Sequence, residues 1–237
     1  MTEKQREKFK ELLMELEDKK ILPHFVLIGS WAELMYEETG LIKEFKPALR
    51  TQDLDFLLKD KSKTKKFSKP RDIGSLLISM GYKFNASFPE EFERYEIYHE
   101  DFDDELIMFV EFLASETGKE GDNPHKYEQF GIKAQTLRQL SMFRDNTVEV
   151  EWEGVKVTVP TPSAYVLQKM FINDQRRTPA KRDKDIASIE YLLEFIKGNP
   201  VLMKEMKATF NGYFKKQKAQ IRKFCERQKI DLADYMI

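Results

Sequence analysis

The sequence is poor in the residues that build disulfide-bonded, metal-thiolate and low-complexity proteins. Its one cysteine, Cys225, cannot close an intrachain disulfide or form a cysteine-based zinc site. A single thiol is typical of a reducing cytoplasm, and we expect it to be buried and unreactive. With 10 Gly, 9 Pro, 41% hydrophobic and 12% aromatic residues, the composition excludes collagen-like, repetitive and disordered chains.

Long apolar runs and an excess of one charge are also missing. No stretch approaches the roughly 18 apolar residues of a membrane span, and the N-terminal 20 residues are charged where a signal peptide is apolar. The 40 basic and 41 acidic residues give a net charge of -1, without the global positive charge of a nucleic-acid binder. We therefore expect a cytoplasmic protein with no membrane and no DNA partner, in which any RNA-binding surface is local.

The pattern along the chain predicts a mixed α/β part followed by a helical part. Alternating or apolar runs indicate strands over 24–30 and 50–60 and hairpins over 95–113 and 147–160. Helical spacing indicates helices over 3–19, from 73 to a stop near Gly81, and over 161–174, 180–197 and 200–229. We predict an α+β fold, with an antiparallel or mixed sheet and flanking helices in a domain over 1–160, and a helical domain over 161–237.

Three carboxylates are the main candidates for chemistry. Asp53 and Asp55 lie two residues apart on a predicted strand and therefore project from one face, where their charges repel unless a cation or proton offsets them. Mg²⁺ does this with one or two carboxylates and substrate phosphates. Glu111 stands among apolar residues in LIMFVEFLA, so it also needs a compensating partner. The alternative is that the aspartates are solvated on an edge strand and that Glu111 pairs with a Lys or Arg.

Gly29 and Ser30 stand between a predicted strand and a predicted helix. A glycine at this turn lets backbone N–H groups approach a phosphate, the serine hydroxyl adds a donor, and the start of the helix adds a favourable field. The dipeptide alone is a weak signal. It gains weight from the aspartate pair on the strand that follows.

In this order, VLIGS, DLDF and VEF resemble the signature of the nucleotidyltransferase superfamily with the polymerase-β-like fold. The resemblance implies that the Gly29–Ser30 turn holds a nucleoside triphosphate (NTP). It also implies that Asp53, Asp55 and Glu111 act as catalytic carboxylates that bind two Mg²⁺ ions. Compared with minimal members of the superfamily, residues 40–49 look like an insertion.

The later motifs resemble the AbiEii/DUF1814 branch, which includes toxin-type nucleotidyltransferases. The residues that carry this are RTQDLDF at 50–56, a lone helical Lys169, and KDI at 184–186. The branch implies that Lys169 contacts the nucleotide phosphates, that Asp185 completes the pocket, and that an antitoxin protein is a candidate partner.

The helical pattern makes its own prediction for Asp185. This residue falls on the same helix face as Ile189, Leu192 and Ile196, which must pack inward, so its carboxylate needs a partner. Lys169 on the preceding helix is in a position to supply it. A purely structural Lys–Asp pair is the alternative to a nucleotide-binding role.

We therefore expect a Mg²⁺-dependent enzyme that transfers a nucleoside monophosphate from an NTP to a hydroxyl acceptor, with tRNA or another RNA as the first candidate. Basic segments at 59–71 and 204–229 favour RNA, whereas the acidic block at 90–105 opposes it. Solvated surfaces explain the basic segments equally well. The alternatives are a small-molecule or protein side-chain acceptor, and a non-catalytic nucleotide- or RNA-binding module with the same fold.

Overall fold

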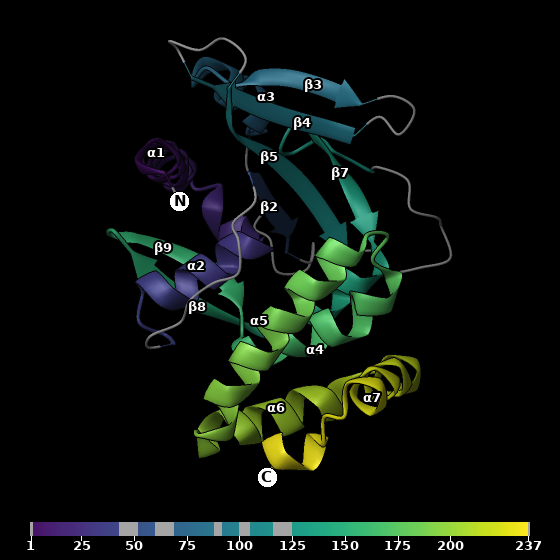
Figure 1. The fold of residues 1–237 in the computed structure, drawn as a ribbon. Coiled ribbons are helices and arrows are strands. Elements are labelled where there is room, and N and C mark those ends of the chain that lie inside the picture. The colour runs from purple at the N-terminus through teal and green to yellow at the C-terminus, as the bar shows by residue number, and fades with distance from the viewer. Residues whose placement is uncertain are drawn as a thin grey trace.

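A computed structural model describes residues 2–42, 52–59, 69–87, 92–99, 105–115 and 125–236. Within these ranges, seven strands form one sheet and a two-stranded hairpin lies beside it, with helices on the sheet and at one end (Figure 1). Most of the predicted insertion at 40–49, of the basic segment at 59–71 and of the acidic tip of the 95–113 hairpin falls outside the described residues.

The order of strands in the main sheet is β1-β2-β5-β4-β3, with β7 and β6 continuing from β5. The strands are β1 (Phe25–Ile28), β2 (Asp53–Leu58), β3 (Lys83–Ser87), β4 (Phe92–Tyr98), β5 (Leu106–Ser115), β6 (His125–Tyr127) and β7 (Ile132–Leu137). β2 runs parallel to β5 and antiparallel to β1, so the predicted mixed sheet is confirmed. β5 is long enough to pair with β4 along its first part and with β7 along its last three residues.

Helix α1 (Glu3–Asp18) covers part of the sheet and confirms the amphipathic pattern. A capping box formed by Thr2 and Gln5 starts it, and its buried residues are Phe9, Leu12, Leu13 and Leu16. The Phe9 ring lies 4.5 Å from that of Trp31 and 5.1 Å from that of Trp152, between α2 (Ser30–Glu38) and the hairpin of β8 (Thr147–Trp152) and β9 (Val155–Pro160). The helix therefore joins the hairpin to the rest of the core.

Replacing Phe9 with alanine tests this junction. The ring is fully buried between two tryptophans, so we expect the free energy of unfolding to fall by about 3–5 kcal/mol. Chemical denaturation monitored by tryptophan fluorescence measures the change. Met14→Ala, on the exposed side of the same helix, is the control and should have little effect.

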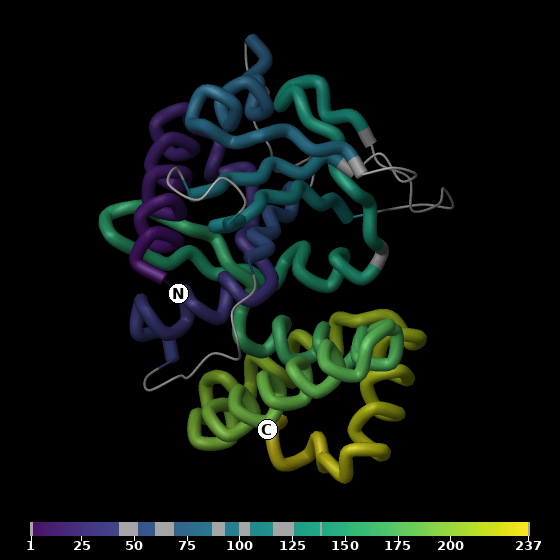
Figure 2. The backbone as a smooth tube through the Cα atoms, turned by 45° about the horizontal axis from the view of Figure 1, so that its top comes forward, coloured from purple at the N-terminus to yellow at the C-terminus, as the bar shows by residue number. Residues whose placement is uncertain are grey.

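The helices that follow β9 gather at one end of the molecule, as both views show (Figures 1 and 2). They are α4 (Pro162–Ile172), α5 (Pro179–Lys197), α6 (Pro200–Gly212) and α7 (Lys215–Gln228). Cys225 is buried on α7 with its Sγ 3.8 Å from the Met170 sulfur, as expected for an unreactive thiol. Within the described residues, no helix combines the length and apolar composition that crossing a membrane requires.

Three sequence predictions of secondary structure were wrong or incomplete. The single helix predicted over 200–229 is broken, because Tyr213 and Phe214 are extended and the buried Tyr213 hydroxyl donates to the Met142 carbonyl oxygen, 3.2 Å away. The helix predicted from residue 73 to a stop near Gly81 is confirmed as α3 (Ile73–Ser79), but strand β3, which begins at Lys83, was not predicted. Strands β6 and β7 were not predicted.

Candidate functional site

The three candidate carboxylates lie on one face of neighbouring parallel strands. Asp55 of β2 is directly opposite Glu111 of β5, and Asp53 is two residues earlier on β2. Paired residues of a ladder, and residues two apart on one strand, project to the same side. Leu54, between the two aspartates, and Phe56, which follows them, are fully buried on the other side. The predicted common face is therefore present, and β2 is not an edge strand.

Gly29 brings the turn after β1 against this face. Ile28, the last residue of β1, is opposite Asp55, and the chain leaves the strand at the next residue. Gly29 has φ +68° and ψ -154°, a region of backbone conformation that is essentially restricted to glycine. A Cβ atom built on it would lie 2.8 Å from Asp55 Oδ2. The turn and the carboxylate are therefore in close contact, with Ser30 buried as the first residue of α2.

Gly29→Ala should damage both stability and activity. We expect a loss of about 1–3 kcal/mol from the backbone strain, together with displacement of the Asp55 carboxylate. Gly154→Ala is a matched control, because Gly154 also has a positive φ (+83°) but has no atom within 4 Å of an added Cβ. Unfolding measurements, together with assays of the nucleotide transfer that the sequence resemblance implies, should show two destabilised proteins, of which only the Gly29 variant loses activity. Equal activity of the two would contradict a role for the contact with Asp55.

The three carboxylates on this face repel one another electrostatically. Burial raises the pKa of Asp55 to about 8, and the negative charges of Asp53 and Glu111 add to the increase, against the opposing effect of Arg176 and Lys181. A carboxyl group that resists ionisation beside two others has the electrostatics expected of a cation-binding site.

Glu111 is only partly buried, with 27% of its side chain exposed, although its neighbours in the sequence are apolar. Alternate residues of β5 point to the two faces, so the apolar neighbours line the core while Glu111 faces outward with the aspartates. It accepts hydrogen bonds from Arg94 Nε and Nη2 of β4, at 3.0 and 2.8 Å, both on Oε1. The alternative that Glu111 pairs with an arginine is therefore confirmed, and Oε2 is the oxygen not used in this pair.

The three carboxylates fit a hard divalent cation by the chemistry of their oxygens. Over the described ranges, no three His, Cys, Asp or Glu side chains are already gathered around one point. Asp53, Asp55 and Glu111 are the residues that could hold such a cation.

The electrostatic field of cations from the helical part reaches the carboxylates. Besides Arg176 and Lys181, which act on Asp55, Lys184 of α5 lies in the field of Asp53. Burial and the charge of Lys169 lower the pKa of Lys184, while Glu33, Asp53 and Asp185 oppose that change. Acidic and basic groups therefore meet where α5 begins, an arrangement suited to a metal-bound polyphosphate.

The pair of Lys169 and Asp185 is confirmed and belongs to a larger buried network. Lys169 Nζ lies 2.8 Å from Asp185 Oδ1, and the two side chains are 8% and 3% exposed. Arg176 Nε donates to Asp185 Oδ2 at 2.7 Å. Although burial acts to raise it, the charges of Lys169 and Arg176 hold the pKa of Asp185 below its ordinary value.

The sequence did not single out Glu33, which lies at the centre of this network. Its side chain is fully buried, with Oε1 3.5 Å from Lys169 Nζ. The only signal in the sequence was the position of this glutamate, one turn after Gly29. The structure then shows that most residues of its helix are buried. Arg94 and Arg176 were also missed, since each reaches its carboxylate from a different element.

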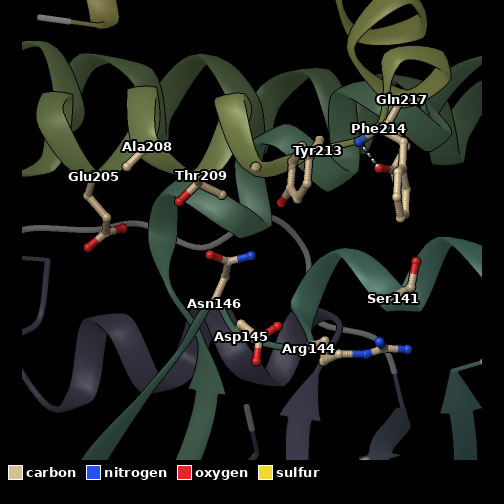
Figure 3. Close-up of a pocket in the computed structure, with 11 residues that line it drawn as sticks. Ser141, Arg144, Asp145, Asn146, Glu205, Ala208, Thr209, Tyr213, Phe214 and Gln217 are labelled. Carbon is tan, nitrogen blue, oxygen red and sulfur yellow. Dashed lines mark hydrogen bonds between the residues drawn. The ribbon is translucent and has the colours of Figure 1, made fainter.

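A separate cavity of 780 Å³ lies between α6 and the segment that precedes β8. Figure 3 shows Glu205, Ala208 and Thr209 of α6 on one side and Asp145 and Asn146 on the other. None of the candidate site residues lines it. The cavity is therefore distinct from the face that carries the carboxylates.

Comparison with known proteins gives a family and a fold. The profile of a family described as Nucleotidyltransferase matches residues 7–208. An antigenic nucleotidyltransferase-like protein from Paracoccidioides brasiliensis is similar in structure, with a TM-score of 0.52 and 15% identity over 92% of this chain and 85% of that one.

Weaker likenesses were found to structures of the antibiotic-resistance factor ANT(2″)-Ia. The solution structure has a TM-score of 0.46 and 12% identity, covering 96% of this chain and 95% of that one. The crystal structure with adenylyl-2″-tobramycin has a TM-score of 0.43 and 11% identity, covering 93% and 97%. No match was found among curated proteins.

Proposed function

Because the chain belongs to a family of nucleotidyltransferases, we propose that it transfers a nucleoside monophosphate from an NTP to a hydroxyl acceptor at the face formed by β2 and β5. The observation that carries this site is the contact of Gly29 with Asp55, which brings a phosphate-binding type of turn against three carboxylates on one side of the sheet.

We assign Asp53, Asp55 and Glu111 as ligands of divalent metal, with Mg²⁺ the favoured ion because these donors are all carboxylates. When bound, Mg²⁺ offsets the phosphate charges and lowers the pKa of a coordinated hydroxyl group. Glu111 has to hold the metal through Oε2 or give up Arg94, whose two bonds both go to Oε1.

The residues around the carboxylates have positioning and electrostatic roles in this proposal. The Gly29–Ser30 turn and the start of α2 bind the triphosphate. Lys169, Arg176, Lys181 and Lys184 supply positive charge toward it, and Asp185 keeps Lys169 and Arg176 in place. The acceptor oxygen then bonds to the α-phosphorus as the bond to the β-phosphate oxygen breaks. Pyrophosphate leaves, and the hydroxyl proton passes to a base or to solvent.

For the acceptor we propose RNA, with tRNA as the first candidate, as in the toxin-type AbiEii/DUF1814 branch that the order of motifs resembles. The exposed side of α7 supports this, since Lys215, Lys216, Arg222 and Lys223 are exposed there while Ile221, Phe224 and Cys225 face the core. An antitoxin partner and a cytoplasmic location belong to the same proposal. We also propose a domain boundary at residue 160. The hydrogen bond between Tyr165 of α4 and Glu33 of α2 joins the two proposed domains.

The test is nucleotide transfer with each α-labelled NTP, Mg²⁺ and total RNA, with a parallel reaction that contains a small-molecule extract. We expect label on RNA with the wild-type protein and none with Asp53→Asn. Glu149→Gln, on the exposed β8–β9 hairpin, serves as the control and should retain full transfer. Label only on a small molecule or on protein would overturn the RNA acceptor. No label on any acceptor, with Mg²⁺-independent binding of NTP, would indicate a non-catalytic module instead.

A further inference from the structure

Glu33 is a buried carboxylate that the proposed reaction does not use. It lies on α2, has a fully buried side chain, and is among the most enclosed charged groups of the described chain. Its Oε1 accepts hydrogen bonds from Tyr165 Oη and from Ser188 Oγ, each 2.7 Å long. Because leaving a carboxylate in the core costs several kcal/mol unless it is well compensated, its place calls for an explanation.

One set of contacts connects Glu33 to the Gly29 turn. The Tyr165 hydroxyl lies 2.7 Å from Glu33 Oε1 and 2.9 Å from the carbonyl oxygen of Gly29, so its single proton is shared between these two acceptors. Burial and the charge of Glu33 raise the pKa of Tyr165 well above its ordinary value, which keeps the proton on the hydroxyl. The carboxylate, the tyrosine and the turn therefore form one continuous connection, which ends at the contact with Asp55.

A second set of contacts connects Glu33 to the cations. Lys169 Nζ lies between Glu33 Oε1 at 3.5 Å and Asp185 Oδ1 at 2.8 Å, and above the Tyr165 ring at 4.8 Å from its centroid. Two anions close to one ammonium group fix its position better than one. Asp185 extends this series of contacts to Arg176, whose charge acts on Asp55.

We propose that Glu33 is a positioning residue of the transferase site: it fixes the Gly29 turn through Tyr165 and fixes Lys169 directly. The inference rests on the proposed function, because it concerns the two groups assigned there to the phosphates of the NTP. The contacts join α2 to α4 and α5, so the helical part holds the turn and the lysine in one fixed arrangement.

The test compares three variants that each change one interaction at Glu33 Oε1. Glu33→Gln removes the charge that faces Lys169, and Tyr165→Phe removes the hydroxyl that reaches Gly29. Ser188→Ala is the matched control, since it removes a buried hydrogen bond of the same length to the same oxygen but contacts neither the turn nor the lysine. Steady-state kinetics with varied NTP and thermal unfolding are measured on each variant.

We expect Glu33→Gln and Tyr165→Phe to raise KM for the NTP about tenfold or more, with kcat changed less, because groups that bind the phosphates are displaced. Ser188→Ala should keep KM within about twofold, although it lowers the melting temperature. A purely structural role reduces the fraction of folded enzyme, which lowers kcat and leaves KM unchanged.

The outcomes separate this inference from the proposed function. If the wild-type protein transfers nucleotide and all three variants share its KM, Glu33 has no positioning role and only the inference fails. The same conclusion follows if Ser188→Ala raises KM as much as Glu33→Gln does. If the wild-type protein transfers no nucleotide to any acceptor, the proposed function fails and the inference fails with it.

Discussion

Asp55→Asn is expected to abolish nucleotide transfer and, at the same time, to stabilise the metal-free protein at pH 8. Transfer should fall by about 10³-fold or more if Asp55 is the metal ligand proposed above, because the substitution then removes that ligand from the centre of the site. The gain in stability has a different origin. Asp55 is held beside Asp53 and Glu111 with a pKa of about 8, so ionising it costs free energy that asparagine does not.

The sign of the pH dependence follows from the direction of that shift. Between the ordinary pKa of an aspartate, near 4, and the folded value of about 8, the folded state binds more protons at Asp55 than the unfolded state does. The stability of the metal-free wild type relative to Asp55→Asn therefore falls as pH rises through this window. Near pH 8 we therefore expect the variant to melt several degrees higher than the metal-free wild type.

Thermal unfolding of both proteins from pH 5 to pH 9, with and without Mg²⁺, measures these effects. Mg²⁺ should raise the melting temperature of the wild type more at pH 8 than at pH 6, because protons compete with the metal at low pH. It should not raise that of Asp55→Asn to the same extent. A difference in melting temperature between the two proteins that is constant across pH would show that the neighbouring carboxylates do not oppose ionisation of Asp55. Equal stabilisation of the two proteins by Mg²⁺ would show that Asp55 is not a metal ligand.

The sequence predicted the carboxylate face because strand periodicity is local. Asp53 and Asp55 share a face by their spacing alone, and the order of the strand, the Gly29 turn and the helix carried the resemblance to a nucleotidyltransferase. The family and the mixed sheet are confirmed. The pairing of Lys169 with Asp185 was also predictable, since each residue flanks or occupies the apolar face of its own helix.

The contacts that depend on register between distant segments were not predictable. Arg94 reaches Glu111 only because β4 lies next to β5 with these two residues opposite each other. Glu33 looks like an ordinary surface glutamate in WAELMYEE until α4 and α5 cover that side of α2. The break between α6 and α7 had a local signal that the sequence analysis overlooked, because α6 ends at the Asn211–Gly212 pair, a common helix stop. The tertiary contact of Tyr213 with the Met142 carbonyl adds to this signal and could not be predicted.

The buried network makes a ranked prediction about stability. Lys169→Met should destabilise the fold by about 3–5 kcal/mol, the cost of leaving a buried charge without its partner. Asp185→Asn should cost less. Removing Lys169 leaves both Glu33 and Asp185 in the core without their ammonium group, whereas removing the charge of Asp185 still leaves Lys169 facing Glu33 at 3.5 Å. Arg176, whose side chain is 35% exposed, then regains hydration.

Chemical denaturation of the two variants and of Arg176→Gln at pH 7 tests the ranking. Arg176→Gln is the control and should cost least, because Asp185 retains Lys169. The pH dependence gives a second check. The folded pKa of Asp185 is lowered, so its contribution to stability is present above about pH 4 and is lost as pH falls through the folded value. Asp185→Asn should therefore approach the wild type in stability under acid conditions. At neutral pH, Lys169→Met should be the more destabilised of the two variants, because it leaves Glu33 uncompensated. Equal losses for Lys169→Met and Arg176→Gln would show that Glu33 and Asp185 do not depend on the buried lysine.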